Sequence, residues 1–253
     1  MDTQHLTLLT GASRGMGLAM ARQCVAAGHD LVAIARRPAP ELDALAAARG
    51  TLCEQWAHDL ADAAPLCERL AAFLGHIGPQ RYASVTLINN AGLIPAIAPL
   101  GDIPAADLAA ALRVDLEAPM LLAGAFLRAT AHWTGTRRLL NISSGLGRRP
   151  MASQAAYCAA KAGMDLFTRC VALEEAQRPN GARVCSLAPG VIDTDMQVQL
   201  RGADAGAFPD IANFIGFKDK GLLASPEEAA RKVLAYLARP DFGANPLGDV
   251  RDA

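Results

Sequence analysis

Short apolar runs alternate along this chain with longer stretches in which apolar residues recur at helical spacing. The apolar runs predict strands at 6–9, 29–35, 51–59, 84–92, 136–144 and 182–190, with a short seventh strand in the final segment, 242–253. The helical stretches between them are 18–28, 40–49, 63–74, 104–130 and 157–177, and a last helix begins after Ser225. Regular alternation of this kind predicts one α/β unit, a doubly wound parallel sheet with helices on both faces.

The first strand leads directly into the glycine-rich run TGASRGMG at 10–17. Gly11 and Gly15 allow a tight turn in which the backbone approaches a diphosphate, and Gly17 lets the following helix pack on the strand. The amino terminus of that helix attracts the anion. The pattern predicts a dinucleotide-binding domain of Rossmann type, with residues 1–253 forming a single domain.

No acidic residue ends the second strand, where enzymes that use NAD place one to bind the adenosine ribose. Ala35 stands there instead, and Arg36 and Arg37 follow, with Arg14 nearby in the glycine-rich run. A guanidinium group matches a phosphate in charge and geometry, so NADP(H) is the predicted cofactor. The alternative is that these arginines are simply solvated. Asp59, at the predicted end of the third strand, is a candidate to accept from the adenine amino group.

Tyr157 and Lys161 are four residues apart in a predicted helix, and Ser144 precedes the tyrosine at the end of the fifth strand. Residues at i and i+4 share one helix face, so the phenol and the ammonium group are expected side by side. A nearby cation lowers the pKa of a tyrosine from its ordinary value of about 10. Such a tyrosine can exchange a proton with a carbonyl or an alcohol. The plain alternative is an ordinary tyrosine beside an exposed lysine.

The segment at about 195–222 interrupts the alternation and mixes Gly, Pro and charged residues with Phe208, Phe214 and Phe217. This composition predicts a mobile flap that closes over an apolar ligand. The alternative is that the three rings pack on the body of the domain. Asp249, near the carboxyl terminus, is a weaker candidate for contact with a substrate amino group, against the alternative of a solvated tail.

Charge and cysteine content narrow the classes of partner. The formal net charge of -1 removes the electrostatic case for binding nucleic acid or an anionic membrane. The six cysteines and five histidines are dispersed without metal-ligand spacing, so no metal site is expected. The first residues show neither a basic region nor a long apolar segment, which predicts a soluble cytoplasmic protein.

Taken in order and at their spacings, these motifs resemble those of the short-chain dehydrogenase/reductase family over essentially the whole chain. The resemblance implies a general acid at Tyr157, a lysine that holds the nicotinamide ribose at Lys161 and a carbonyl-orienting serine at Ser144. It also implies cofactor contacts from the glycine turn, the second-strand arginines, NNAG and PGVIDT. These residues are Gly11, Ser13, Arg14, Gly15, Met16, Gly17, Arg36, Arg37, Asp59, Leu60, Asn89, Ala91, Gly92, Tyr157, Lys161, Pro189, Gly190, Ile192 and Thr194.

One position departs from the family pattern. Members usually have Asn in the helix after NNAG, where it holds a water in a relay to the lysine, and here that residue is Asp115. A carboxylate there would stabilise the Lys161 cation while partly cancelling its effect on Tyr157. Turnover is expected to survive with a shifted pH profile.

Within the family, YCAAKAG followed by LAPGVIDTDMQ is most similar to sepiapterin reductases and bacterial benzil reductases, which use NADPH on vicinal or activated carbonyls. The resemblance therefore implies reduction of a ketone, a diketone or a pterin-like side chain. Two alternatives stay open: an alcohol dehydrogenase working in the oxidative direction, and an NADP-binding sensor or scaffold without efficient chemistry. Relatives commonly pair through the helices at 104–130 and 157–177, which implies a homodimer or homotetramer.

Overall fold

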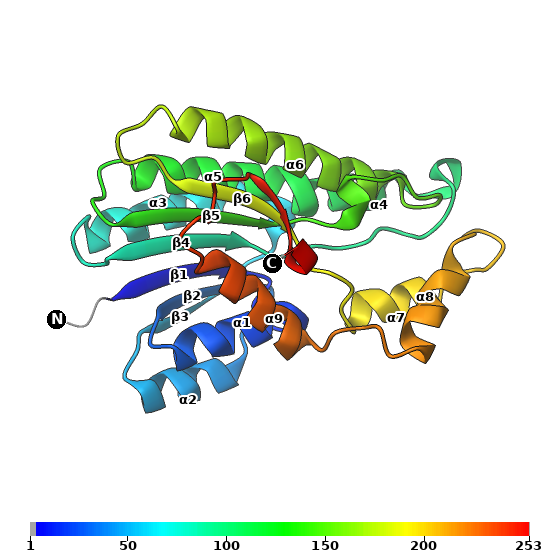
Figure 1. The fold of residues 1–253 in the computed structure, drawn as a ribbon, viewed down its shortest axis with the longest axis horizontal. Helices are drawn as coiled ribbons and strands as arrows, with labels where there is room; N and C mark the ends of the chain where they lie inside the picture. Colours follow the sequence, from blue (N-terminus) through cyan, green and yellow to red (C-terminus); the bar gives the residue numbers. More distant parts are fainter. Residues whose placement is uncertain (1–3, 253) are drawn as a thin grey trace.

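Seven parallel strands form one twisted sheet in the computed structural model, which describes residues 4–252 (Figure 1). The strand order is β3-β2-β1-β4-β5-β6-β7, so the direction of winding reverses between β1 and β4. The strands are β1 His5–Thr10, β2 Asp30–Ala35, β3 Cys53–Ala57, β4 Ser84–Asn89, β5 Thr136–Ile142, β6 Arg183–Ala188 and β7 Leu247–Asp249. The predicted doubly wound parallel sheet is confirmed.

Helices cover both faces of this sheet (Figure 1). One face is covered by α3 Ala64–Ile77, α4 Ala105–Leu112, α5 Ala118–Ala129 and α6 Ala155–Glu175. The other face is covered by α1 Gly15–Ala26, α2 Pro40–Arg49 and α9 Pro226–Leu237. The remaining two helices, α7 Asp195–Arg201 and α8 Ile211–Asp219, extend beyond the ends of the strands. Within residues 4–252, short 3₁₀ segments lie in the connections at Leu60–Asp62, Leu100–Asp102 and Gly145–Gly147, and another, Val250–Asp252, follows β7.

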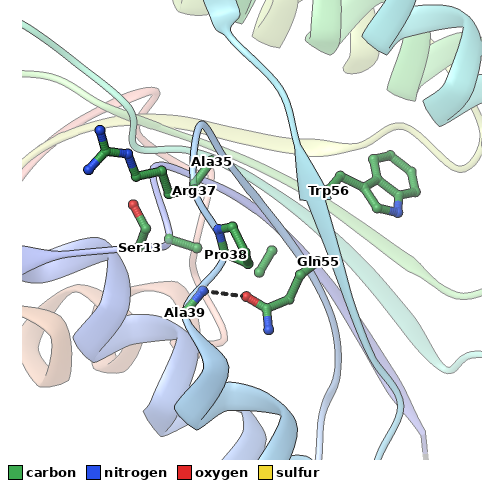
Figure 2. Close-up of a pocket in the computed structure, with 9 residues that line it drawn as sticks. Ser13, Ala35, Arg37, Pro38, Ala39, Gln55 and Trp56 are labelled. Atoms are coloured by element: carbon green, nitrogen blue, oxygen red, sulfur yellow. Dashed lines mark hydrogen bonds between the residues drawn. The ribbon is translucent and has the colours of Figure 1, made fainter.

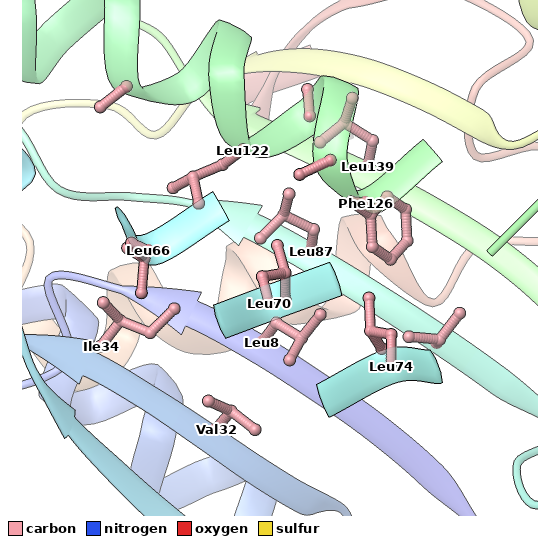
Figure 3. Close-up of a cluster of buried hydrophobic side chains, with 14 of the residues drawn as sticks. Leu8, Val32, Ile34, Leu66, Leu70, Leu74, Leu87, Leu122, Phe126 and Leu139 are labelled. Carbon is pink, nitrogen blue, oxygen red and sulfur yellow. The ribbon is translucent and has the colours of Figure 1, made fainter. Parts of the chain in front are cut away.

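Each face of the sheet has its own hydrophobic core. Leu66, Leu70 and Leu74 lie on one stripe of α3, because residues four apart share a helix face, and they pack against Leu8 and Leu87 of the sheet (Figure 3). All five side chains are at most 1% exposed. These cores hold the strands rigidly, so the loops at the strand ends have fixed anchors.

The predicted helix at 104–130 proved to be three joined segments. A π-helical turn, Arg113–Glu117, separates α4 from α5, and the N–H of Ala118 bonds the carbonyl of Arg113, five residues back. Pro119 has no N–H to donate to the carbonyl four residues before it, which is that of Asp115. The missing bond explains why the α-helical pattern is interrupted at this point, and π turns are frequent at functional sites.

Two further predictions are corrected by the structure. The third strand ends at Ala57, not at Asp59, which instead caps the following 3₁₀ turn by accepting from the N–H of Ala61. The segment predicted as an irregular flap contains two helices, α7 and α8. The helix start at Ser225 is confirmed, because its hydroxyl accepts from the N–H of Glu228.

Within residues 4–252, no helix is long and apolar enough to cross a membrane. The same part of the chain has no group of three or more His, Cys, Asp or Glu side chains suited to a metal ion.

Candidate active site

The loops that follow β1, β4, β5 and β6 meet at the carboxyl end of the sheet. These four strands are neighbours in the order β1-β4-β5-β6. The direction of winding reverses between β1 and β4, so the loop after β1 and the loop after β4 lead to helices on opposite faces of the sheet. Ligands of open α/β sheets bind in the crevice at such a reversal. All of the predicted catalytic residues lie on these loops or on the helices that begin from them.

The glycine turn after β1 is tightly packed against the loop after β4. Gly11 has a φ of +70°, and a Cβ there would lie 2.8 Å from the Nδ2 atom of Asn90. A Cβ on Gly17 would collide with the carbonyl oxygen of Gly11. Asn90 closes this contact by donating to the Thr10 carbonyl at 2.9 Å, and its own N–H donates to the Thr10 hydroxyl at 2.9 Å.

The amino terminus of α1 is free to bind an anion. Arg14 is its N-cap residue without a capping side-chain bond, and no acidic residue lies in the first turn. Orphan N–H groups and the helix dipole therefore face the glycine turn unopposed, which fits a diphosphate. Thr194 lies close by, since its methyl carbon is 3.4 Å from the position of a Cβ on Gly15. Arg14 itself donates to Asp195 at 2.8 Å, and both side chains are exposed.

The predicted adenosine side of the site lies at the ends of β2 and β3. Arg36 and Arg37 are both exposed, directly after β2. Figure 2 shows Arg37 beside Ser13 at a small cavity that Pro38 and Trp56 also line. Arg36 does not line this cavity, so the two predicted arginines are not placed alike. One carboxylate oxygen of Asp59 caps the adjacent 3₁₀ turn.

The side chains of Asn89 and Asn90 point to opposite sides of the sheet. Asn89 donates to the Asn141 side chain at 2.9 Å and is only 2% exposed, under α5. Asn90 instead reaches the glycine turn. The family resemblance implies a cofactor contact for Asn89 and none for Asn90. The alternation of side chains along a strand was the signal that could have separated the two.

Several other predicted contact residues have buried side chains. Met16 and Leu60 belong to the hydrophobic core and are 7% and 8% exposed, so only their backbone atoms remain for cofactor contacts. Ala91 lies against Gly11, whose Cβ would be 2.9 Å from the Ala91 Cα. Ile192 pairs with Ala224 in an isolated parallel bridge, which closes the base of the segment that carries α7 and α8.

Pro189 and Gly190 follow β6 directly, and the backbone turns there. Gly190 has a φ of +82°, in the left-handed region that favours glycine. This turn leads the chain through Ile192 to Thr194, and hence to the glycine turn.

Tyr157, Lys161 and Ser144 are brought together as predicted from their spacing. Tyr157 and Lys161 lie on α6, are 7% and 3% exposed, and the lysine Nζ is 5.6 Å from the centre of the tyrosine ring. Lys161 donates to the carbonyl of Ile142, at the end of β5, at 3.1 Å. Ser144 follows two residues later and accepts from the N–H of Leu146 at 3.1 Å. The nearby Ser144 side chain acts to lower the pKa of the tyrosine.

The net shift of the Tyr157 pKa is nevertheless upward. Burial raises this pKa most, the Asp115 carboxylate adds to the rise, and the Ser144 side chain only partly opposes them. The predicted net lowering of the Tyr157 pKa is therefore wrong, whereas the opposing effect expected of Asp115 has the predicted direction. The physical reason is that removing the phenolate from water costs more free energy than the neighbouring groups recover by stabilising its charge. Tyr157 holds its proton at neutral pH.

Asp115 is completely buried in the π turn. Its Oδ1 accepts from the N–H of Leu93 at 2.9 Å, and its Oδ2 has no hydrogen-bond partner. A Cβ on Gly92 would lie 3.1 Å from this Oδ1 and 3.7 Å from the Lys161 Nζ, so both charged groups approach the Gly92 backbone. Burial raises the pKa of Asp115, while Lys161 and the Leu93 N–H oppose the rise.

The phenylalanines of the predicted flap pack over Tyr157. We call the buried residues Ile94, Leu146, Tyr157, Leu200, Phe208 and Phe214 the apolar cluster. Phe208 is fully buried, and its ring centre is 5.4 Å from that of Phe214. Gln199 ties α7 to the loop after β4 by donating to the carbonyl of Ile94 at 3.2 Å. The structure thus supports the alternative that these rings pack on the body of the domain. They pack in the same cluster as Tyr157, the candidate catalytic residue.

Asp249 is not available as a free carboxylate. It lies in β7, is 6% exposed, and accepts from the backbone N–H of Arg251 at 2.9 Å and from its guanidinium group at 2.8 and 2.5 Å. These bonds lower the pKa of Asp249. Asp249 is thus ordered and paired with Arg251, and it does not belong to a solvated tail, which was the alternative considered from the sequence.

Comparisons with known proteins agree with this geometry. Residues 5–205 match the family model described as short chain dehydrogenase. A benzil reductase ((S)-benzoin forming) of Bacillus cereus is 34% identical over 243 residues, covering 96% of each chain. The sepiapterin reductase of Meriones unguiculatus is 31% identical over 252 residues, covering 93% of this chain and 92% of that one.

A solved structure supports the same assignment. The short-chain dehydrogenase/reductase of Burkholderia vietnamiensis is 30% identical, with a TM-score of 0.65 and coverage of 98% of this chain and 99% of that one. The resemblance inferred from the motifs, including that to benzil and sepiapterin reductases, is confirmed. The chain belongs to the short-chain dehydrogenase/reductase family, oxidoreductases that act on carbonyl or alcohol groups with a nicotinamide cofactor.

Proposed function

We propose that this protein is an NADPH-dependent carbonyl reductase that converts an apolar ketone, a diketone or a pterin-like side chain to the alcohol. The observation that carries the proposal is the convergence of Tyr157, Lys161 and Ser144 beside the glycine turn, under an apolar cover. The benzil and sepiapterin reductases among its relatives act, by their names, on substrates of this kind.

Tyr157 donates the proton that the new alcohol oxygen requires. The Ser144 side chain lies near enough to influence this phenol, so the two hydroxyls can hold one carbonyl oxygen and polarise it. Lys161 contributes a fixed positive charge next to the tyrosine, held by the Ile142 carbonyl. When bound, the nicotinamide cofactor supplies the hydride that reduces the carbonyl carbon.

Carbonyl reduction needs Tyr157 in its protonated form, and burial of the phenol favours that form. A tyrosine that keeps its proton is ready to act as an acid, whereas alcohol oxidation needs the phenolate as a base. The apolar cluster contributes to this state, because it excludes water from the phenol. An oxidative role would require Tyr157 to lose that proton.

The cofactor choice rests on the positive charges around β2. Arg36 and Arg37 lie at its end, Ser13 faces the cavity that Arg37 lines, and no acidic residue stands where NAD-specific sites carry one. The glycine turn and the free end of α1 would hold the diphosphate. We propose that one of the two arginines binds the 2′-phosphate of NADPH.

We further propose that the protein assembles as a dimer or tetramer through α4, α5 and α6. Leu112, Met120 and Leu121 are 41%, 43% and 41% exposed on the first two helices, and Leu166 and Leu173 are 59% and 72% exposed on α6. Leu112, Met120 and Leu121 line one shallow hollow, and grouped exposed apolar side chains are characteristic of a protein interface. The cytoplasmic location stays a prediction.

Tyr157→Phe should lower kcat for carbonyl reduction by about 10²- to 10⁴-fold, because the proton donor is lost. NADPH binding, measured by cofactor fluorescence, should be retained. Tyr82→Phe is the matched control: its hydroxyl donates to Asp30 at 2.7 Å, away from the site, so it should lower stability and leave kcat unchanged. A wild-type protein that binds NADPH tightly but reduces no carbonyl would point to the sensor or scaffold role.

Asp115→Asn should move the alkaline limb of the reduction rate profile to lower pH. The Asp115 carboxylate raises the pKa of Tyr157, so a neutral amide lowers that pKa, and the tyrosine loses its proton earlier as pH rises. The measurement is kcat against pH, with the exposed neighbour Glu117→Gln as control. An unchanged rate and profile in Asp115→Asn would place this residue outside the relay.

Replacing both Arg36 and Arg37 by Ala should raise the KM for NADPH about tenfold or more and leave the KM for NADH nearly unchanged, because a charge-assisted bond to the 2′-phosphate is lost. Arg37 lines the cavity with Ser13 and Arg36 does not, so one single variant should account for most of the effect. Arg49→Ala, at the end of α2, is the control. Equal losses with both cofactors would contradict the NADPH assignment.

Met120→Glu should shift the protein to a smaller species in light scattering coupled to size-exclusion chromatography, because a charge would be buried in the proposed interface. Leu52→Glu is the control, since Leu52 has nearly the same exposure, 42%, but lies in the connection before the edge strand β3, not on α4, α5 or α6. A wild-type monomer at micromolar concentration would overturn the proposal.

A further inference from the structure

The side-chain amide of Gln154 is buried without a single hydrogen bond. Gln154 is 1% exposed, and neither its Nε2 nor its Oε1 has a partner. It is the N-cap residue of α6 but does not cap the helix through its side chain. A primary amide has two donor hydrogens and an acceptor oxygen, and leaving them unpaired inside a protein is costly. Such a group in a native fold needs an explanation.

Gln154 lies next to the catalytic residues. It precedes Tyr157 by three residues and Lys161 by seven, the spacing that keeps side chains on one helix face. Three residues correspond to about 4.5 Å along a helix axis, within reach of a glutamine side chain. Met151, three residues before Gln154, and Cys158, four residues after it, pack against the apolar cluster. The unpaired amide therefore lies within one helical turn of Tyr157, between two residues that contact the cluster around that tyrosine.

The backbone next to Gln154 is strained, and a hydrogen bond joins it to the segment that carries α7 and α8, which we call the cover. Ser153 is the only non-glycine residue within 4–252 with a positive φ, +61°. Its hydroxyl donates to the carbonyl of Ala207, next to Phe208 in the segment between α7 and α8. Strained residues persist where the surrounding structure holds them, and they concentrate at ligand sites. Movement of the cover would act directly on the residue that precedes Gln154.

We propose that Gln154 is a specificity-determining residue, whose amide donates a hydrogen bond to an oxygen on the carbon next to the reacting carbonyl. This inference rests on the proposed reductase function and narrows its substrates to vicinal dicarbonyls and related α-oxygenated ketones. Tyr157 and Ser144 hold the reacting oxygen, and Gln154 holds the neighbouring one from one helical turn away. An otherwise apolar site gains selectivity from one polar group, because a substrate without the second oxygen leaves that group unpaired.

The test compares two substrates with the same two phenyl rings. Benzil has two adjacent carbonyls, and deoxybenzoin has a methylene group in place of one of them. Gln154→Met, of similar size but unable to donate, should lower kcat/KM for benzil about tenfold and change that for deoxybenzoin less than twofold. Gln197→Met is the matched control, since Gln197 is also buried, at 7% exposure, with an unpartnered Oε1, but lies on α7 and not on the helix of Tyr157. It should not discriminate between the two substrates.

Thermal unfolding provides a readout independent of activity. Gln154→Met should unfold at the same temperature as the wild type or higher, because it removes a buried unpaired amide. A lower unfolding temperature with equal losses on both substrates would show a structural role and overturn the inference. Equal activity of wild type and variant on benzil would also overturn it. A wild type that reduces neither ketone nor any other carbonyl would instead refute the proposed function itself.

Discussion

The burial of the Lys161 ammonium group is the constraint that organises the carboxyl end of the sheet. A charged group at 3% exposure is stable only if hydrogen bonds and opposite charge replace its water. The Ile142 carbonyl supplies the hydrogen bond, and the Asp115 carboxylate supplies the charge from the π turn. Gly92 leaves room for both. The end of β5, the π turn and the loop after β4 are therefore held around one side chain, and Tyr157 takes its place from the same helix.

The parallel topology explains why residues so distant in sequence share one site. Parallel strands end at the same edge, and the reversal between β1 and β4 opens a crevice there. The glycine turn and the loop after β4 are joined by Asn90, and Thr194 brings the loop after β6 against Gly15. The two hydrophobic cores keep the strand ends rigid, so these contacts need little adjustment when a ligand binds.

The apolar cluster sets the acid–base properties of the site. Phe208 and Phe214 exclude water from Tyr157, which raises the pKa of the phenol and keeps it protonated. The same exclusion makes any unpaired polar group near the site expensive, and Gln154 is such a group. The proposed reduction of apolar activated ketones and the proposed role of Gln154 are consistent with each other, because both depend on a site from which water is excluded.

The sequence by itself determined the features that depend on neighbouring residues. Apolar runs, the glycine turn, the face shared by Tyr157 and Lys161, and the start of the last helix at Ser225 all follow from local geometry, and the structure contains each of them. Tertiary packing alone decided the opposite orientations of Asn89 and Asn90, the π turn at Asp115, the helical cover over Tyr157 and the upward shift of the tyrosine pKa. The physical reason is that desolvation depends on which segments lie around a group. Spacing along the chain places Lys161 beside Tyr157 and the family pattern points to Asp115, but only the fold shows that Tyr157 is buried in one cluster with Phe208 and Phe214.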